Sequence, residues 1–307
     1  MLSKCTPLIY IPSLPFFAST WTSMPWGASM SNVIAVVNHK GGTGKTTTAI
    51  NLAAGLTRYS DITSSCLVID MDPHGCATST LMGKLDGEPP ARTVFDVLRR
   101  AITPQDGITS TVYDENIDIL PANPSLESMA KTQINDRLAK VVASLSTSYG
   151  WIIIDTPPNL GVLTQNALVA ADYALIPTQC NGLAVPTLRQ IKYLIEKIQE
   201  RPNMWLQILG VLITQKDGRT PLQKHVRKEL GQVFPASDIF KTVITSNIKI
   251  EEAPANFQSI YAYDSGCLGA SLYRDWIKKE FIKKHQKLEK LKVEKREAAE
   301  AEAAQSS

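Results

Sequence analysis

The sequence predicts a doubly wound α/β fold, in which a mostly parallel sheet carries helices on both faces within a single domain. Short apolar runs alternate with segments of helical periodicity from residue 33 to residue 230. The runs are apolar throughout, which is typical of parallel strands buried on both faces. A glycine-rich loop joins the first run to the first helical segment. The hydrophobic fraction of 44% and charged fraction of 20% provide for a large core and exclude disorder of the chain's body.

The expected strands are short, mostly apolar runs. They are Val33–Val37, Cys66–Ile69, Ile117–Leu120, Trp151–Ile154, Tyr173–Ile176 and Ile208–Ile213. The expected helices carry apolar residues three or four positions apart. They are Thr46–Tyr59, Thr93–Ala101, Leu126–Leu145, Val162–Ala170, Pro186–Gln199 and Pro221–Leu230. In a sheet of this kind, ligands bind at the carboxyl ends of the strands.

The two ends of the chain are expected to lie outside the domain, which we assign to residues 32–276. Residues 1–31 hold an apolar stretch interrupted by four prolines, too broken for a membrane-spanning helix. We expect an unstructured extension or a mis-assigned start codon there. Residues 277–307 predict a charged helical tail that projects and frays. From Lys278 to Glu302, nine Lys and Arg residues stand against six Glu, so this tail supplies the whole net charge of +3.

The five cysteines are scattered along the chain and form none of the close pairs that metal sites or redox motifs require. This spacing fits a reducing compartment, and we expect a cytoplasmic protein.

The segment between the first strand and the first helix has the composition of a phosphate-binding loop. Its glycines let backbone N–H groups approach phosphates, and the start of the helix adds a positive dipole. Lys45 is expected to bridge the β and γ oxygens of ATP, and Thr46 to ligate Mg²⁺. The strict pattern G-x-x-x-x-G-K-[ST] is not met, because its first position falls on His39. The loop residues expected to bind ATP are Lys40, Gly41, Gly42, Thr43, Gly44, Lys45, Thr46 and Thr47.

This loop resembles the deviant Walker A motif of the ParA/MinD ATPases, which carries an extra lysine at its start, here Lys40. Leu67–Pro73 resembles the second acidic motif of that family, and Ile152–Pro158 resembles its Walker B strand end. The order and spacing of the motifs also match, and the resemblance covers residues 32–276. A chance glycine-rich turn would not be followed by two further motifs in order. The resemblance implies a P-loop NTPase fold that uses ATP and Mg²⁺.

Three aspartates follow predicted strands in these motifs. Asp155 closes a strand and can reach Mg²⁺ through a water, because Mg²⁺ keeps much of its hydration shell. Asp72 could orient or deprotonate the attacking water, and the alternative for both residues is a capping aspartate. Asp70 is expected to be structural. The resemblance implies the catalytic role for Asp72, and it implies that Lys40 reaches across a dimer to the partner's nucleotide, so that hydrolysis requires dimerisation.

Thr245–Pro254 resembles the adenine-side loop of the family, which implies that Asn247 and Pro254 contact the nucleotide. The usual form has an arginine directly before the asparagine, and Ser246 stands there instead. His74 replaces the customary glutamine after Asp-Pro, and Asn181–Leu183 departs from the usual acidic-aromatic segment. These departures predict a divergent branch.

ATP binding alone does not choose among the family's functions, which include DNA segregation, placement of the division site on membranes, electron transfer and cargo positioning. The electron-transfer branch needs cluster-ligating cysteines in a glycine-flanked context, and the sequence has none. The membrane branch ends in an amphipathic helix, for which the candidate is Phe281–Arg296. Dense lysines interrupt its apolar stripe, so the composition favours a solvated helix or a partner-binding coil.

A basic region from Lys216 to Lys249 is the candidate DNA-binding surface. The residues that we assign to it are Lys216, Arg219, Lys224, Arg227, Lys228 and Lys249. Three of them share one face of the predicted helix 221–230. Such a cationic face can contact phosphates but cannot distinguish one base sequence from another. A plain solvated face fits the spacing equally well. The segment Lys216–Thr220 resembles the Asp-Gly-Arg-Thr turn of partition ATPases, which bind nucleoid DNA from this region as ATP dimers, and this favours DNA.

The sequence therefore predicts a ParA-like DNA-partitioning ATPase that forms a homodimer with Mg-ATP and binds DNA nonspecifically. Its hydrolysis is expected to be weak until a ParB-like partner stimulates it, and its location to be the nucleoid. The alternatives are a MinD-like membrane-surface or cargo-positioning ATPase and a nucleotide-binding scaffold without catalysis.

Overall fold

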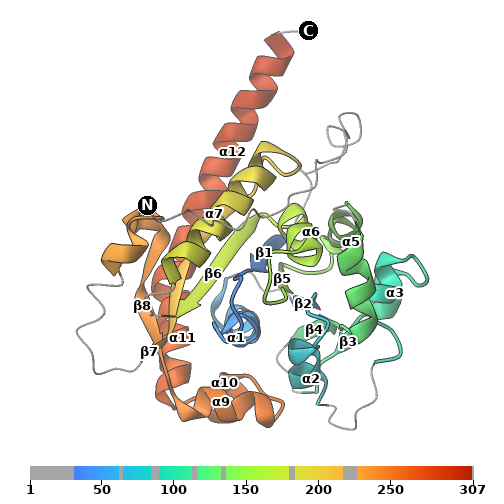
Figure 1. Ribbon diagram of the computed structural model, residues 1–307, viewed down its shortest axis with the longest axis vertical. Coiled ribbons are helices and arrows are strands. Elements are labelled where there is room, and N and C mark those ends of the chain that lie inside the picture. The colour runs from blue at the N-terminus through green and yellow to red at the C-terminus, as the bar shows by residue number, and fades with distance from the viewer. Residues whose placement is uncertain are drawn as a thin grey trace, which may run out of the picture.

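Within the described residues, eight strands form one sheet in the order β3–β4–β2–β5–β1–β6–β7–β8 (Figure 1). The computed structural model describes residues 31–61, 65–83, 90–112, 116–132, 136–179, 184–216 and 227–305. The strands are β1 (Asn32–Val36), β2 (Cys66–Asp70), β3 (Thr109–Ser110), β4 (Ile117–Leu120), β5 (Trp151–Asp155), β6 (Tyr173–Gln179), β7 (Gln207–Lys216) and β8 (Ile239–Thr245). Only the short β3 pairs antiparallel with its neighbour, so the predicted mostly parallel sheet is confirmed.

The helices cover both faces of this sheet, as the doubly wound fold requires. They are α1 (Lys45–Tyr59), α2 (Cys76–Met82), α3 (Val94–Leu98), α4 (Pro104–Gly107), α5 (Arg137–Leu145), α6 (Val162–Ala170), α7 (Ala184–Glu200), α9 (Ile248–Ala255), α10 (Ile260–Asp264), α11 (Leu268–Trp276) and α12 (Ile282–Gln305). Two 3₁₀ segments, η1 (Pro124–Lys131) and η2 (Ala236–Asp238), and one π-helical segment, η3 (Ile277–Phe281), join them.

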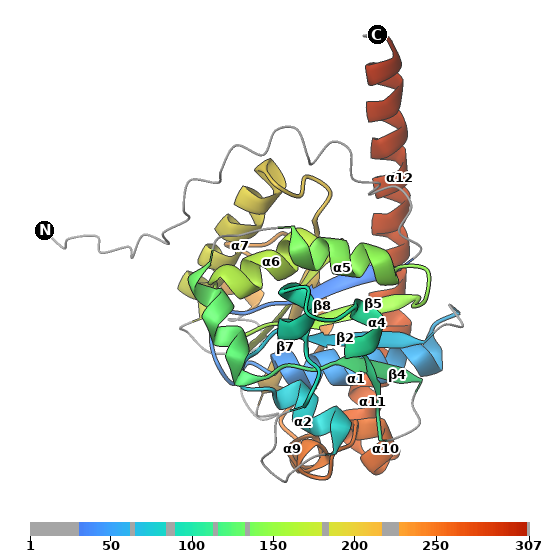
Figure 2. The ribbon, with the colours of Figure 1, turned by 90° about the vertical axis from the view of Figure 1, so that its right-hand side faces the viewer.

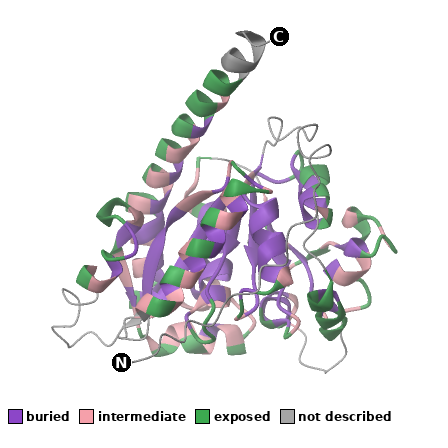
Figure 3. Ribbon diagram, turned by 45° about the horizontal axis from the view of Figure 1, so that its top comes forward, coloured by how far each residue is buried: buried purple, intermediate pink, exposed green. Residues whose placement is uncertain are grey.

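Alternate residues of β1 show how the core divides into two layers. Val33 and Ala35 belong to the apolar cluster that contains residues of α3, α5, α6 and α7. Ile34 and Val36 belong to the cluster built with α1, α10 and α11. Because successive side chains of a strand point to opposite faces, a strand that is apolar throughout is buried on both. Figure 3 shows the resulting concentration of buried residues in the sheet and its flanking helices.

β1 lies near the middle of the sheet, paired in parallel with β5 on one side and β6 on the other. From β1 the chain runs to β2 on the β5 side, and β6, β7 and β8 then fill the opposite side. Ligands of parallel sheets bind at the carboxyl ends of strands beside such a change of direction. The loop after β1 occupies this position.

Most predicted elements are present, with their ends shifted by at most three residues. The predicted helix 126–145 is wrong, because the structure has the 3₁₀ segment η1 and begins α5 at Arg137. Leu126 and Met129 are the buried residues of η1, and their spacing of three is the repeat of a 3₁₀ helix. β8 was not predicted, because exposed or half-buried residues interrupt its apolar pattern. Of the predicted helix 221–230, residues 227–230 are helical and the remainder lies outside the described residues.

The C-terminal helix packs on the body through its first half and extends beyond it through its second half (Figures 1 and 2). Ile277 and Phe281 are fully buried in η3, in the cluster that also contains Trp151 and Trp276. A tail that projects as a whole was expected from residue 277, but the packing continues without a break past residue 276. Of residues 1–31, expected to be an extension, residues 1–30 lie outside the described residues, and Ser31 belongs to the body instead, because it is buried and its hydroxyl donates to the carbonyl of Ser146 over 2.8 Å.

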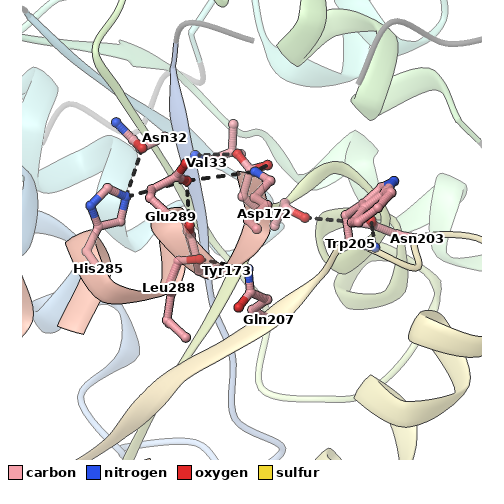
Figure 4. Close-up of polar contacts among 12 residues, drawn as sticks. Asn32, Val33, Asp172, Tyr173, Asn203, Trp205, Gln207, His285, Leu288 and Glu289 are labelled. Atoms are coloured by element: carbon pink, nitrogen blue, oxygen red, sulfur yellow. Dashed lines mark hydrogen bonds and ion pairs between the residues drawn. The ribbon is translucent and has the colours of Figure 1, made fainter. Parts of the chain in front are cut away.

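Polar contacts fix α12 to the amino ends of three strands (Figure 4). His285 Nε2 lies 2.8 Å from Asn32 Oδ1 at the start of β1. The Tyr173 hydroxyl, at the start of β6, donates to Glu289. Gln207 Nε2, at the start of β7, donates to the carbonyl of Leu288 over 3.4 Å. A buried ion pair between Lys292 and Asp172 completes the contact.

His285 makes folding stability sensitive to acid. Burial lowers the pKa of His285 from 6.5 to about 4, although the charges of Glu289 and Asp172 act in the opposite direction. Below pH 6.5 the unfolded chain takes up a proton that the folded chain accepts only near pH 4, so stability is lost as the pH falls through this window. We expect His285 to contribute up to about 3 kcal/mol to this loss.

Urea unfolding at pH 7.5 and pH 4.5 measures this effect in the wild type and in His285→Gln. The variant is expected to lose less stability than the wild type between the two pH values. His39→Gln, which removes an exposed histidine, is the matched control and should follow the wild type. Equal pH dependence in all three proteins would contradict the role of His285.

Candidate nucleotide site

The loop from Lys40 to Gly44 wraps around the start of α1. Gly42 and Gly44 have φ angles of 71° and 79°, in the left-handed region that favours glycine. Two neighbouring strand ends hold this shape through loop carbonyls: Gln179 Nε2 donates to Gly42 O over 2.7 Å, and Thr214 Oγ1 donates to Thr43 O over 2.8 Å. The loop amides at the helix start provide the setting in which anions bind.

Lys45, the first residue of α1, is buried and turns back over the loop. Its Nζ donates to the carbonyl of Lys40 over 3.3 Å. Desolvation lowers the pKa of Lys45, and the charges of Asp155 and Asp72 oppose this shift. The ammonium group therefore lies between the phosphate loop and two carboxylates. The side chain of Lys40 itself is exposed at the mouth of the loop.

Asp70 and Asp155 end neighbouring strands and are both fully buried, but their environments differ. Asp70 accepts hydrogen bonds from Thr78 N (2.9 Å), Thr78 Oγ1 (2.7 Å) and Asp72 N (3.0 Å). Burial raises the pKa of Asp70 to about 6 against these bonds. Asp70 thus ties β2 to α2, which agrees with the structural role expected for it.

Among the described residues, neither carboxylate oxygen of Asp155 has a hydrogen-bond partner of normal geometry. Burial, followed by the charge of Asp70, raises the pKa of Asp155 to about 8, while the nearby Thr46 hydroxyl and Lys45 oppose this shift. A buried carboxylate without a partner is costly unless a cation compensates it. Carboxylate and hydroxyl oxygens are ligands that Mg²⁺ prefers. The pair Asp155 and Thr46 therefore fits Mg²⁺ or one of its bound waters.

Asp155→Asn is expected to stabilise the empty protein and to weaken the effect of Mg²⁺. A carboxyl group whose folded pKa is raised loses stability as the pH rises from 3.8 towards 8, so the neutral amide should gain about 1–3 kcal/mol at pH 8. In the same variant, Mg²⁺ should enhance ATP affinity less than in the wild type. Denaturant unfolding and nucleotide titration with and without Mg²⁺ measure the two effects.

Asp70→Asn is the matched control, because it makes the same change at the neighbouring strand end. It should be less stable than Asp155→Asn by about 1–3 kcal/mol, since an amide cannot accept all three bonds that Asp70 receives, and removing a charge whose pKa is raised only to about 6 returns less stability. An Asp155→Asn variant that is no more stable than Asp70→Asn would contradict the contrast between the two aspartates.

Asp72 lies just after β2, and its side chain faces Lys45 and His74. Asp72 Oδ1 accepts from the backbone N of His74 over 3.1 Å and contacts His74 Nδ1 over 2.9 Å. The hydrogen bond and the charge of Asp72 raise the pKa of His74, whose side chain is 72% exposed. The residue that replaces the family's usual glutamine therefore holds the carboxylate expected to act in catalysis.

A cavity of ≈ 300 Å³ opens beside the loop, between α1 and the segment that follows β8. It brings together the predicted residues Thr47, Asn247 and Pro254, although more than 190 positions separate the first from the others in sequence. Asn247 also begins α9, where its Oδ1 accepts from Lys249 N over 2.8 Å. Ser246, in the place of the expected arginine, lines the same cavity. The arrangement offers a half-enclosed space for a base next to the phosphate loop.

Of the predicted DNA-binding residues that the structure describes, two are engaged within the chain. Arg227 donates to the carbonyls of Phe240 (3.0 Å) and Lys241 (2.6 Å), and so holds the chain before β8. Lys249 pairs with Glu252 over 2.9 Å. Lys228 is exposed. The remaining candidates, Arg219, Lys224 and the side chain of Lys216, lie outside what the structure describes, as does the divergent segment Asn181–Leu183.

Sequence reasoning missed the residues that brace the loop. Asn38 Nδ2 donates to the carbonyl of Pro177 over 2.6 Å, and Asn38 Oδ1 accepts from Lys40 N over 3.0 Å. Gln179 and Thr214 hold the loop carbonyls from the ends of β6 and β7. The sequence feature that could have identified these residues is a polar residue at the carboxyl end of an apolar strand. The same feature led to the aspartates.

A central parallel sheet, a glycine loop between β1 and α1, a buried lysine and an unpaired aspartate together define a P-loop nucleotide-binding protein. Residues 31–208 match the family described as an AAA domain. Over 256 residues the chain is 38% identical to the sporulation initiation inhibitor protein Soj of Bacillus subtilis, covering 81% of this chain and 98% of Soj. It is 34% identical over 269 residues to the chromosome partitioning protein ParA of Myxococcus xanthus, covering 85% and 93%.

Solved structures agree with these relatives. Cobyrinic acid a,c-diamide synthase from Mycobacterium smegmatis, with a bound ATP analog and magnesium, is 30% identical with a TM-score of 0.64, and the match covers 82% of this chain and 98% of that one. The chain belongs to the ParA/MinD-type P-loop ATPases. Binding of nucleotide and Mg²⁺ is a property of this family.

Proposed function

We propose that this protein is a ParA-like partition ATPase that dimerises with Mg-ATP, binds DNA without sequence preference and hydrolyses ATP when a ParB-like partner stimulates it. The observation that carries the proposal is the loop arrangement, in which buried Lys45 lies between the phosphate loop and Asp155 and Asp72 while Lys40 is exposed at the loop mouth. The identity to Soj and ParA relatives supports the partition role.

Each residue of the site has a distinct task in this proposal. The loop amides and Lys45 bind the phosphates, and the cavity with Asn247 and Pro254 takes the base. Thr46 and Asp155 hold Mg²⁺, which when bound neutralises charge on the phosphate oxygens. Asp72, positioned by His74, orients the attacking water.

The exposed Lys40 side chain is available to a second protomer. A cation supplied in trans stabilises the charge of the phosphoryl-transfer transition state, so hydrolysis depends on dimer formation. In the ParA-like scheme, the ATP dimer binds DNA, and the partner triggers hydrolysis and release. We place the protein on the nucleoid in the cytoplasm.

The alternative of a MinD-like membrane-surface ATPase is less well supported by the packing of α12. A membrane anchor needs a free apolar stripe. Phe281 is fully buried, and Ile282 and Leu288 pack against the core, which leaves Leu291 and Val293 as the exposed apolar residues of the candidate stripe. No helix in the described parts of the chain has the length and apolar character needed to span a bilayer.

Light scattering of the full chain with ATP, ADP and no nucleotide tests the proposal, together with the hydrolysis rate. The proposal predicts a dimer with ATP and a monomer otherwise. Lys40→Ala should still bind ATP and should lose stimulated hydrolysis, because its cation acts on the partner's nucleotide. A monomer in all three nucleotide states that still hydrolyses ATP would contradict the proposal.

A further inference from the structure

The five lysines between Ile282 and Val293 fall into two groups. The first group is engaged by the body: Lys284 pairs with Asp238 over 2.7 Å, and Lys292 pairs with Asp172. The second group consists of Lys283, Lys287 and Lys290, which are all exposed. In the described part of the chain, no hydrogen bond, ion pair or ring contact engages their ammonium groups.

These three lysines share one face of α12, because residues three and four positions apart lie side by side on a helix. At a rise of 1.5 Å per residue, Lys283 and Lys290 are separated by about 10 Å along the helix axis. The face ends at Glu294, four residues after Lys290. It is a short, purely cationic stripe.

The opposite face of the helix holds the stripe in place. His285, Glu289 and Lys292 contact the amino ends of β1 and β6 and the turn before β6, as Figure 4 shows for the first two. A rigid support lowers the entropy lost when charged side chains bind a partner. The stripe lies in the half of α12 that packs on the body, on the face opposite these contacts, and the second half of the helix continues beyond the body (Figure 2).

We propose that Lys283, Lys287 and Lys290 form a surface that binds the phosphate backbone of duplex DNA. This inference rests on the proposed function and names the site of its DNA contact. A duplex carries a phosphate every 3.4 Å along each strand, so a stripe about 10 Å long can meet several of them. Such contacts carry no sequence information, which fits nonspecific binding.

Two observations favour DNA as the ligand of this lysine stripe. The first is that Arg227 and Lys249, two of the residues expected to bind DNA, are bonded to backbone carbonyls and to Glu252, whereas Lys228 is exposed. The second is that Phe281, Ile282 and Leu288, three of the five apolar residues of the candidate membrane stripe, pack against the core, leaving Leu291 39% and Val293 49% exposed. Because α12 docks at the amino ends of the strands, DNA bound there leaves the phosphate loop at the carboxyl ends open to a second protomer.

The test is fluorescence anisotropy of a random-sequence duplex with the full chain and ATP, at several salt concentrations. The triple variant Lys283→Gln, Lys287→Gln and Lys290→Gln is expected to bind at least ten times more weakly. Its plot of log affinity against log salt should be shallower by about 2–3, since each phosphate contact contributes about 0.9 to the slope. Thermal unfolding shows whether the variant is folded.

The matched control removes three exposed cations from another surface: Arg99→Gln, Lys131→Gln and Lys140→Gln. This control should keep DNA affinity within about threefold of the wild type, because a loss of net charge alone acts weakly at a distance in salt. Wild-type affinity in the α12 variant would overturn this inference and leave the proposed function standing. A wild-type protein that binds no DNA with ATP would overturn both.

Vesicles of phosphatidylglycerol provide the remaining comparison. If the wild type binds these vesicles and not the duplex, and the α12 variant loses that binding, the stripe recognises lipid and the assignment to DNA is wrong. Duplex binding without vesicle binding supports the assignment.

Discussion

Lys45→Ala is expected to lower the affinity for Mg-ATP by at least about 100-fold. Lys45 is buried beside the loop carbonyl of Lys40 and supplies the positive charge between the phosphates and the carboxylates of Asp155 and Asp72. Truncating one partner of a buried charge pair costs about 2–5 kcal/mol, of which 2.7 kcal/mol corresponds to a factor of 100. Isothermal titration with ATP in the presence of Mg²⁺ measures the loss.

Lys40→Ala is the comparison for this variant. It removes a lysine from the same loop, but its side chain is exposed and is proposed to act on the partner's nucleotide. Its own ATP affinity should stay within a few-fold of the wild type. If Lys45→Ala binds ATP as tightly as Lys40→Ala does, the loop does not hold the phosphates as described.

Asp72→Ala is expected to keep ATP binding while turnover falls by about 100-fold or more, the contribution typical of a general base or a water-orienting residue. Among the described residues, the side chain of Asp72 bonds only within its own turn, to His74, so its removal should leave the fold intact. With hydrolysis blocked, the ATP-bound dimer should accumulate. Steady-state hydrolysis and light scattering measure the two effects.

Asp61→Ala removes an exposed carboxylate outside the site and should hydrolyse ATP at the wild-type rate. Hydrolysis retained in Asp72→Ala would remove the catalytic assignment of Asp72. Loss of ATP binding in that variant would mean that Asp72 acts on nucleotide affinity instead.

The central strands and the phosphate loop could be predicted from the sequence because their signals are local. β1, β2 and β5 are short apolar runs, each followed within a few residues by a charged or glycine-rich turn. Such runs are buried on both faces of a parallel sheet, so their apolar character is continuous and easy to read. The resemblance of three ordered motifs then joined the loop to its aspartates.

The features that could not be predicted depend on contacts between distant segments. Gln179 and Thr214 brace the loop from strands more than 130 positions away, and their polarity alone does not identify their acceptors. The difference between Asp70 and Asp155 rests on the three donors that reach the first and not the second. Composition gives no sign of which carboxylate is satisfied.

The end of the chain shows the same limit. Dense Lys and Glu residues predicted a solvated helix, and the sequence pattern does not reveal that His285 and Lys292 are buried. Their partners, Asn32 and Asp172, lie more than 100 residues earlier. The sequence alone does not tell whether a given lysine forms a buried ion pair or remains in solvent.

DNA binding by the full wild-type chain with ATP, ADP and no nucleotide, at two salt concentrations, tests the account most directly. A ParA-like partition ATPase should bind random-sequence duplex tightly with ATP and weakly in the other two states, and the ATP-state affinity should fall steeply with salt. Binding that is equal in all three states, or absent from all of them, would contradict the proposal that nucleotide binding at the phosphate loop controls association with DNA.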